Sequence, residues 1–303
     1  MKTRIPGAKV AVSEQIMQVT ANGIRLEYEV AGPAEGPPLI LIRGLGSQMI
    51  HWPAELIIGF AQLGYRVVTF DNRDVGLSQR CPAPGVETSA DRIIEMLRAG
   101  LEPPAAYTLF DMANDVVGLM NVLKIRRAHI FGISMGGGIA QILASDHADR
   151  VLSATIVMSA AHFQPDRIAA VLVQTLDRDA FIDAAVTADR SWGSPGYPLG
   201  ERTVRAIAAA AFDRGADSDG VNRQALATIA AGDRRPRLGG ITVPCLVIHG
   251  AADTLIPPEV GREIASMIPG ADFEMIDGMG HTITPLLSPR IIAHVDAFCR
   301  GNE

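Results

Sequence analysis

The distribution of apolar positions predicts strands and helices that alternate along most of the 303-residue chain. Short, continuous apolar runs are typical of strands buried on both faces of a sheet, whereas apolar residues recurring every three or four positions predict amphipathic helices. The predicted strands are 17–20, 24–30, 39–42, 65–70, 128–133, 151–158, 243–249 and 273–276. The main predicted helices are 52–63, 109–123, 136–146, 258–268 and 291–298, with a short one at 92–97. This order indicates an α/β fold with a mostly parallel sheet flanked by helices.

The alternation is interrupted between residues 161 and 238. Helical patterns occur there at 168–176, 180–188, 204–212 and 223–230, separated by loops that contain Gly and Pro, and no strand pattern is evident. We therefore expect a helical cap, residues 161–238, inserted after the sixth strand of a core formed by residues 1–160 and 239–303. The predicted cap helices are mainly aliphatic, which favours a substrate with an apolar acyl or alcohol group.

Composition narrows the class of protein. The net charge is −6 and no run of basic residues occurs, so nucleic acid is not an expected partner. The chain lacks an apolar run of about 18 residues, and no apolar segment follows the first basic residues, so we expect neither a membrane span nor a signal peptide. Three scattered cysteines are typical of a reducing compartment, which favours a cytoplasmic location. Oligomeric state is not predicted by these features.

A Gly-x-Ser-x-Gly motif occupies residues 132–136 (GISMG), where a predicted strand runs directly into a predicted helix. Glycines on both sides of Ser134 permit a tight turn that side chains would obstruct, and such a turn lifts the serine hydroxyl above the carboxyl edge of the sheet. The first amides of the helix, beginning with the N–H of Met135, would then face the group that the hydroxyl attacks. Ser134 is therefore the predicted nucleophile.

A serine nucleophile needs a base and a carboxylate that orients the base. Asp253 follows strand 243–249 and His281 follows strand 273–276. Because the carboxyl ends of parallel strands share one edge of a sheet, we expect both to meet Ser134 there, in the chain order Ser, Asp, His. Asp277 is an alternative acid, although its closeness to His281 in the sequence favours a loop-capping role. No metal-ligand spacing or nucleotide-binding glycine motif is present, so no metal or cofactor is expected.

Four segments resemble the α/β-hydrolase superfamily and, within it, the serine esterases related to aclacinomycin methylesterase. They are 39–46 (LILIRGLG), 70–78 (FDNRDVGLS), 132–137 (GISMGG) and 278–281 (GMGH). The resemblance covers essentially the whole chain. It implies an α/β-hydrolase fold with a twisted sheet, and an oxyanion hole formed by the backbone amides of Leu45 and Met135.

The loop that follows the strand at 39–42 departs from the usual family pattern. Arg43-Gly44 stands where His-Gly is common in the family. We expect Arg43 to form a structural ion pair with Asp71 or Asp74 rather than to contact substrate. Gly46 and Trp52, on the same stretch, are candidate substrate-pocket residues.

These features predict a carboxylic ester hydrolase that acts on a small-molecule ester through an acyl-enzyme. The same Ser-Asp-His set also serves cofactor-free perhydrolases (haloperoxidases) and C–C bond hydrolases, and amidases and lactonases are open alternatives. A ligand-binding receptor with a vestigial triad is a further alternative. The identity of the substrate is not predicted.

Overall fold

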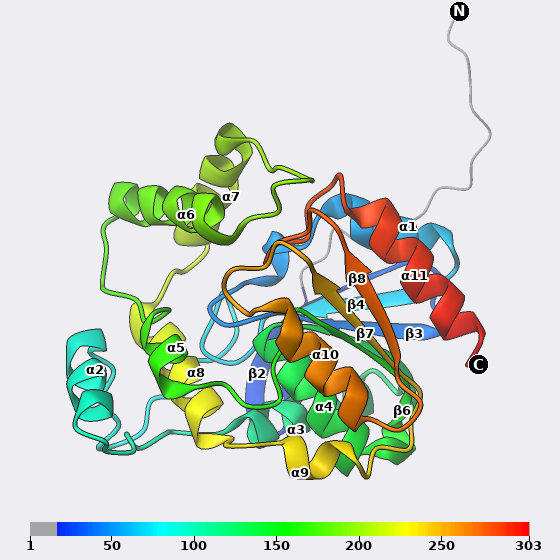
Figure 1. The fold of residues 1–303 in the computed structure, drawn as a ribbon, viewed down its shortest axis with the longest axis horizontal. Coiled ribbons are helices and arrows are strands. Elements are labelled where there is room, and N and C mark those ends of the chain that lie inside the picture. The colour runs from blue at the N-terminus through cyan, green and yellow to red at the C-terminus, as the bar shows by residue number, and fades with distance from the viewer. Residues whose placement is uncertain (1–16, 303) are drawn as a thin grey trace, which may run out of the picture.

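The computed structural model describes residues 17–302, which form one sheet of eight strands with helices on both faces (Figure 1). The predicted lead-in, residues 1–14, lies outside the described residues. Along the sheet the strand order is β1-β2-β4-β3-β5-β6-β7-β8. The N-terminal hairpin, β1 with β2, is antiparallel, and β2 is also antiparallel to β4, whereas β3 to β8 are mutually parallel. The mostly parallel sheet flanked by helices that the sequence predicts is therefore confirmed.

The strand bounds lie within a few residues of the predicted ranges. They are β1 (Met17–Ala21), β2 (Ile24–Ala31), β3 (Pro38–Ile42), β4 (Arg66–Phe70), β5 (Ala128–Ile133), β6 (Val151–Val157), β7 (Cys245–Gly250) and β8 (Asp272–Ile276). β5 and β7 are buried along their whole length, as continuous apolar runs predict for central parallel strands.

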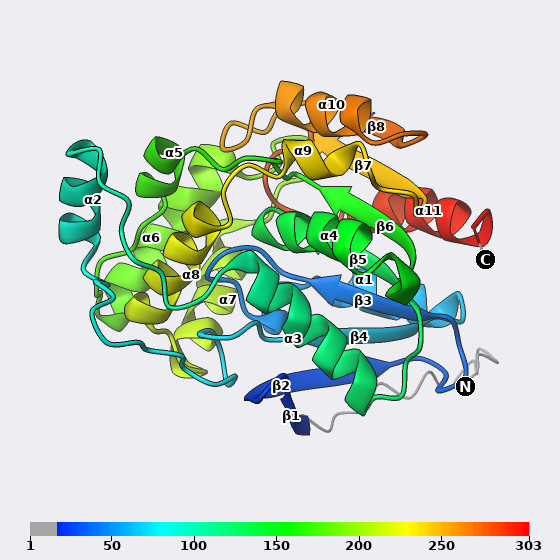
Figure 2. The same ribbon diagram turned by 90° about the horizontal axis from the view of Figure 1, so that it is seen from below.

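Two hydrophobic layers enclose the sheet. Helices α1 (Ala54–Gln62) and α11 (Ser288–Arg300) pack on one face, while α3 (Leu109–Val122), α4 (Met135–Asp146) and α10 (Pro258–Met267) pack on the other (Figures 1 and 2). Short 3₁₀ turns occur at η1 (Met49–His51) and η2 (Ala148–Arg150), and α2 (Ala90–Arg98) lies away from the sheet. No helix among the described residues is long and apolar enough to span a membrane.

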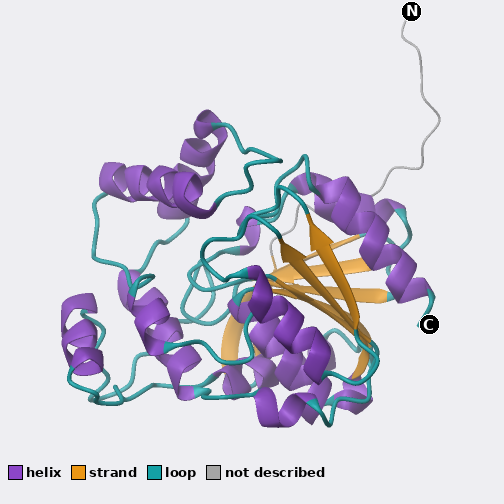
Figure 3. Ribbon diagram, in the orientation of Figure 1, coloured by secondary structure: helices purple, strands orange, loops and turns teal. Residues whose placement is uncertain are grey.

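The helices between β6 and β7 are α5 (Pro165–Ala169), α6 (Arg178–Trp192), α7 (Glu201–Asp213), α8 (Ser218–Ala230) and α9 (Arg235–Leu238), and we call residues 161–238 the cap. Helices α5 to α8 lie beyond the carboxyl edge of the sheet, whereas α9 packs against α4 and α10 on one face (Figures 1 and 2). Figure 3 shows the loops at the carboxyl ends of the strands gathered between the sheet and these helices. The site predicted from the sequence lies among these loops.

One predicted cap helix, 168–176, differs from the structure, because α5 ends at Ala169 and an irregular segment follows. The main-chain N–H and C=O of Val173 are hydrogen-bonded to the side chain of Asn222 instead of to a helical turn. Tertiary hydrogen bonding thus overrides the local helical pattern there. The short helix α9, which begins next to a proline, was not predicted.

Candidate active site

Ser134 lies in a strained turn between β5 and α4. Its backbone has φ 54° and ψ −121°, a left-handed conformation that side chains rarely adopt. The turn is held on both sides, because the Ser134 N–H donates to Val157 O at 2.9 Å and the Ser159 hydroxyl donates to Ser134 O at 2.7 Å. Strain of this kind persists only where the surroundings impose it, and it often marks a functional position.

The two glycines of the motif are required sterically. A Cβ added at Gly132 would lie 2.1 Å from Gly136 O, and one added at Gly136 would lie 2.3 Å from Ile42 O. Both obstacles are backbone atoms, which cannot move aside as a flexible side chain can. Gly44, on the loop after β3, lies directly against the serine, because a Cβ there would be 3.1 Å from Ser134 Cβ. The motif thus brings the loop after β3 against the nucleophile.

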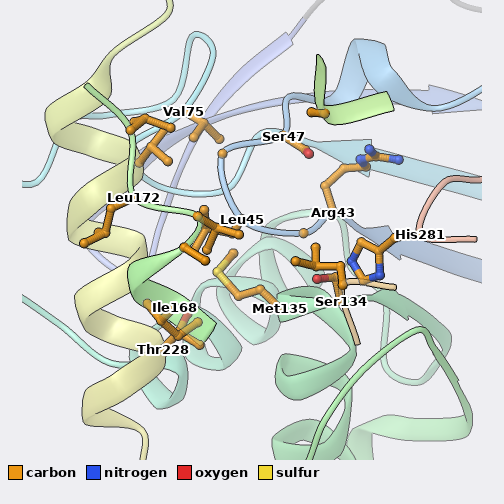
Figure 4. Close-up of a pocket in the computed structure, with 18 of the residues that line it drawn as sticks. Arg43, Leu45, Ser47, Val75, Ser134, Met135, Ile168, Leu172, Thr228 and His281 are labelled. Atoms are coloured by element: carbon orange, nitrogen blue, oxygen red, sulfur yellow. The ribbon is translucent and has the colours of Figure 1, made fainter. Parts of the chain in front are cut away.

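Asp253 and His281 form a hydrogen-bonded pair at the same edge of the sheet. The Nδ1 atom of His281 lies 2.7 Å from Asp253 Oδ2. The other carboxylate oxygen, Oδ1, accepts the main-chain N–H groups of Leu255 and Ile256, each at 2.9 Å. Figure 4 shows the His281 imidazole beside Ser134. The structure therefore brings together the three residues predicted as a triad, whereas Asp277, the alternative acid, is exposed.

Asp253 is kept ionised although it is only 4% exposed. Burial by itself would raise the pKa of this carboxyl, but hydrogen bonding to His249 and His281 and to the Ile256 N–H lowers the pKa below its usual value. His249, near the end of β7, is not among the site residues predicted from the sequence. Its Nε2 atom lies 3.5 Å from Asp253 Oδ2 and 2.9 Å from Ile256 O, so it also supports the acid loop.

The predicted oxyanion-hole donors, Leu45 and Met135, both line the cavity beside Ser134. Neither main-chain N–H donates a hydrogen bond to any other atom in the described part of the chain. Met135 is the first residue of α4, so its N–H is one of the amides that a helix leaves without a partner. Two unengaged amides next to a serine are the donors that a developing oxyanion requires.

A cavity of about 1010 Å³ opens in front of Ser134, between the strand-end loops and the cap. Figure 4 shows Ser134, His281, Arg43 and Ser47 on one side of it, with Leu172 and Ile168 from the cap on the other. The apolar lining includes Leu45, Ile168, Leu172, Phe181, Phe212 and Val221. The cavity therefore has a polar reactive end and an apolar end formed largely by the cap.

Of the two candidate pocket residues, Gly46 lines the cavity and Trp52 does not. Trp52 is 4% exposed and packs edge-on against Phe131, with the Arg43 guanidinium carbon 4.5 Å from its ring centroid. A large apolar ring is more stable in this buried layer than at the cavity surface, which explains the difference from the expectation.

The predicted ion pair of Arg43 is wrong. Asp71 pairs instead with Arg214 at 2.5 Å, and Asp74 pairs with Arg223 at 2.7 Å; both arginines come from the cap. These partners are more than 130 residues away in sequence, so no local signal could reveal them.

Cap residues also hold the loop that carries Leu45. The side chain of Gln224, which is fully buried, accepts the Gly46 N–H at 2.8 Å and donates to Arg73 O at 2.7 Å. On the same loop, Gln48 Nε2 donates to Ala211 O at 2.8 Å. Sequence reasoning missed these contacts, because a glutamine within a helix carries no motif. Among the described residues, no cluster of three or more His, Cys, Asp or Glu side chains could hold a metal ion.

Comparison with known proteins finds relatives of one fold family. Residues 37–284 match the family model described as the alpha/beta hydrolase fold. The chain is 27% identical over 311 residues to rhodomycin D methylesterase of Streptomyces sp. strain C5, covering 93% of this chain and 97% of that protein. It is 26% identical over 267 residues to 3-oxoadipate enol-lactonase 1 of Acinetobacter baylyi, covering 86% and 88%. The crystal structure of the enol-lactonase from Burkholderia xenovorans superposes with a TM-score of 0.70 at 29% identity, covering 94% of this chain and 97% of that one.

Proposed function

The chain belongs to the α/β-hydrolase family, and from this membership and the site geometry we propose that it is a carboxylic ester hydrolase with Ser134 as nucleophile. The observation that carries the proposal is the hydrogen-bonded pair of His281 and Asp253 beside a strained serine at the end of a cavity. The relatives named as a methylesterase and as enol-lactonases support it, because a methyl ester and a lactone both contain a carboxylic ester bond.

Each group has a defined role in the proposed reaction. The Ser134 oxygen attacks the ester carbonyl carbon while His281 accepts the hydroxyl proton, and Asp253 orients the imidazole and stabilises its charged form. The negative carbonyl oxygen accepts hydrogen bonds from the amides of Leu45 and Met135. The C–O bond then breaks, and His281 gives its proton to the leaving alcohol. Water attacks the acyl-enzyme by the same route and releases the acid.

We assign the role of a lid to the cap, residues 161–238, over a core of residues 1–160 and 239–303. The cap supplies most of the apolar lining opposite Ser134, so it is the part that would select the apolar group of an ester. A cavity of about 1010 Å³ has room for substrates well beyond a short-chain ester.

The test is hydrolysis of p-nitrophenyl esters of increasing acyl length by the wild type and by Ser134→Ala. We expect turnover by the wild type, with the chain-length profile reporting the size of the apolar end, and a loss of at least roughly a thousandfold in kcat for the variant. Ser218→Ala is the matched control, because Ser218 lines the same cavity from the cap and takes no part in the proposed reaction.

A fluorophosphonate probe gives a second readout, since it should label Ser134 and leave the S134A protein unlabelled. An inert wild type on every ester, or an S134A protein that keeps its activity, would refute the acyl-enzyme mechanism. Peracid formation, C–C bond cleavage and ligand binding without turnover would then be measured in that order.

A further inference from the structure

Arg43 is a charged side chain at the reactive end of the cavity that has no charged partner. It lines the cavity, its Nε atom is buried, and its guanidinium makes neither a hydrogen bond nor an ion pair with any residue between 17 and 302. Its contact is with the face of the Trp52 ring, 4.5 Å from the guanidinium carbon. The Trp52 indole carries a hydrogen-bond donor and no acceptor, so this contact leaves the N–H groups of the guanidinium without an acceptor.

An unpaired cation in this position lowers the stability of the fold. A buried charge is normally paired or coordinated, since removing it from water costs several kcal/mol unless an opposite charge compensates. Burial lowers the pKa of Arg43 to about 9, and no carboxylate offsets the effect. The group nevertheless stays cationic at neutral pH. An anion bound to the guanidinium would supply the opposite charge that the protein does not provide.

The neighbouring charges strengthen this conclusion. Asp71, one of the two partners expected for Arg43, is fully buried, and its carboxylate is already engaged by Arg214 and by the main-chain N–H groups of Met49 and Leu77. His51, which also lines the cavity, is neutral at pH 7, because burial and the charge of Arg43 lower its pKa to about 4. The polar end of the cavity therefore carries net positive charge close to Ser134.

We propose that Arg43 binds a carboxylate on the substrate, so that the preferred esters are anionic, such as half-esters of dicarboxylic acids; this inference rests on the proposed ester hydrolase function. Arg43 and Ser134 line the same cavity, and Gly44, next to Arg43, packs against the serine, so one substrate molecule could contact both residues. The planar fork of the guanidinium matches a carboxylate in two-point geometry. The apolar end of the cavity, formed by the cap, remains available to another part of the substrate.

The experiment compares pairs of methyl esters that differ only in a terminal carboxylate. Monomethyl succinate, glutarate and adipate are matched with methyl butanoate, pentanoate and hexanoate, and hydrolysis is followed at constant pH by release of methanol. We expect kcat/KM to favour the anionic member of at least one pair. In Arg43→Met this preference should fall about 10- to 100-fold, mainly through KM, because a charge-assisted hydrogen bond is lost. Arg43→Lys should restore part of it.

Two controls separate this role from others. Arg167→Met removes an exposed arginine that lines the cavity from the cap. In this variant the ratio of kcat/KM for the anionic ester to kcat/KM for its neutral match should stay within about twofold of the wild-type ratio. The midpoint of thermal unfolding of Arg43→Met should not fall, because the variant removes an unpaired, partly buried charge. A purely structural role, resting on the contact with Trp52, predicts the opposite pattern: a lower midpoint and a parallel loss on neutral and anionic esters.

The outcomes distinguish this inference from the proposed function. Hydrolysis of neutral and anionic esters with no preference between them would overturn the role of Arg43 and leave the esterase intact. If no ester is hydrolysed, the esterase proposal fails, and calorimetry still tests Arg43: the S134A protein should bind monomethyl succinate or a longer homologue, and S134A with Arg43→Met should not. Equal binding by both proteins, or binding by neither, would overturn the inference.

Discussion

Gln224 joins the cap to the loop that carries the proposed oxyanion-hole amide of Leu45. Its side chain is fully buried and makes two hydrogen bonds with backbone atoms of the core, to the N–H of Gly46 at 2.8 Å and to the C=O of Arg73 at 2.7 Å. Gln224→Leu keeps similar bulk and removes both partners. Each backbone group left buried without a partner costs about 1–3 kcal/mol, so the free energy of unfolding should fall by about 2–6 kcal/mol unless the loop relaxes.

Relaxation of the loop would appear as a loss of rate. If the Gly46 N–H moves to find a partner, the adjacent Leu45 amide leaves the position of the oxyanion, and loss of one such donor costs roughly 100-fold in kcat. We therefore expect kcat for p-nitrophenyl butyrate to fall by about that factor with little change in KM. Gln224→Glu retains an acceptor for Gly46 and should recover part of the rate.

Asn222→Leu provides the matched control for this prediction. Asn222 lies on the same helix, is equally buried, and makes three hydrogen bonds to Val173 and Thr88, none of them to the loop with Leu45. Urea unfolding of Asn222→Leu should show a loss in the free energy of unfolding comparable to that of Gln224→Leu, while kcat is retained. Equal losses of kcat in Asn222→Leu and Gln224→Leu would mean that general cap disorder, and not the position of the loop, controls the rate. An unchanged kcat in Gln224→Leu would refute the reasoning altogether.

Two further predictions concern titratable groups. Asp253→Asn should keep the acceptor for the Leu255 and Ile256 amides but disturb the His281 tautomer, so kcat should fall about 10³- to 10⁴-fold while the protein stays folded, as circular dichroism would show. His51 and His129 have pKa values lowered from 6.5 to about 4, chiefly by burial, so below pH 6.5 the unfolded chain takes up protons that the folded chain does not. The free energy of unfolding should therefore fall as the pH is lowered from 6.5 to about 4, by up to about 3 kcal/mol for each histidine. If urea titrations show a constant free energy of unfolding across this range, the two histidines are not held neutral by burial.

The sequence predicts well those parts that depend on local pattern. Strand and helix positions follow from apolar periodicity, and the turn at Ser134 follows from two glycines whose side chains would meet backbone atoms. The approach of Asp253 to His281 follows from a general property of parallel sheets, because loops at the carboxyl ends of neighbouring strands, β7 and β8, share one edge. In each case the information lies within a short segment or in a rule of topology.

The parts that failed depend on partners distant in sequence. The choice of Asp71 and Asp74 as partners for Arg43 was reasonable from charge and proximity in the sequence, but Arg214 and Arg223 of the cap take both carboxylates. Which of several arginines reaches a buried aspartate depends on how the cap docks, and the apolar periodicity of the cap helices does not specify that. The segment after α5 departs from its helical pattern for the same reason, because it is bound by Asn222.

The cap also contacts the loop that carries His281. The cap is therefore part of the scaffold of the site. The N–H of His281 donates to Trp192 O at 2.6 Å, and the Gly280 N–H donates to the hydroxyl of Ser194 at 2.9 Å, just after α6. The loop of His281 is thus hydrogen-bonded to the cap at Trp192 and Ser194, and the loop of Leu45 at Ala211 and Gln224. A change in the cap that alters the fit of a substrate would therefore also shift the proposed base or the proposed oxyanion donors. Because both loops share this support, we expect substrate selection and rate to be coupled, so cap variants should change kcat as well as KM.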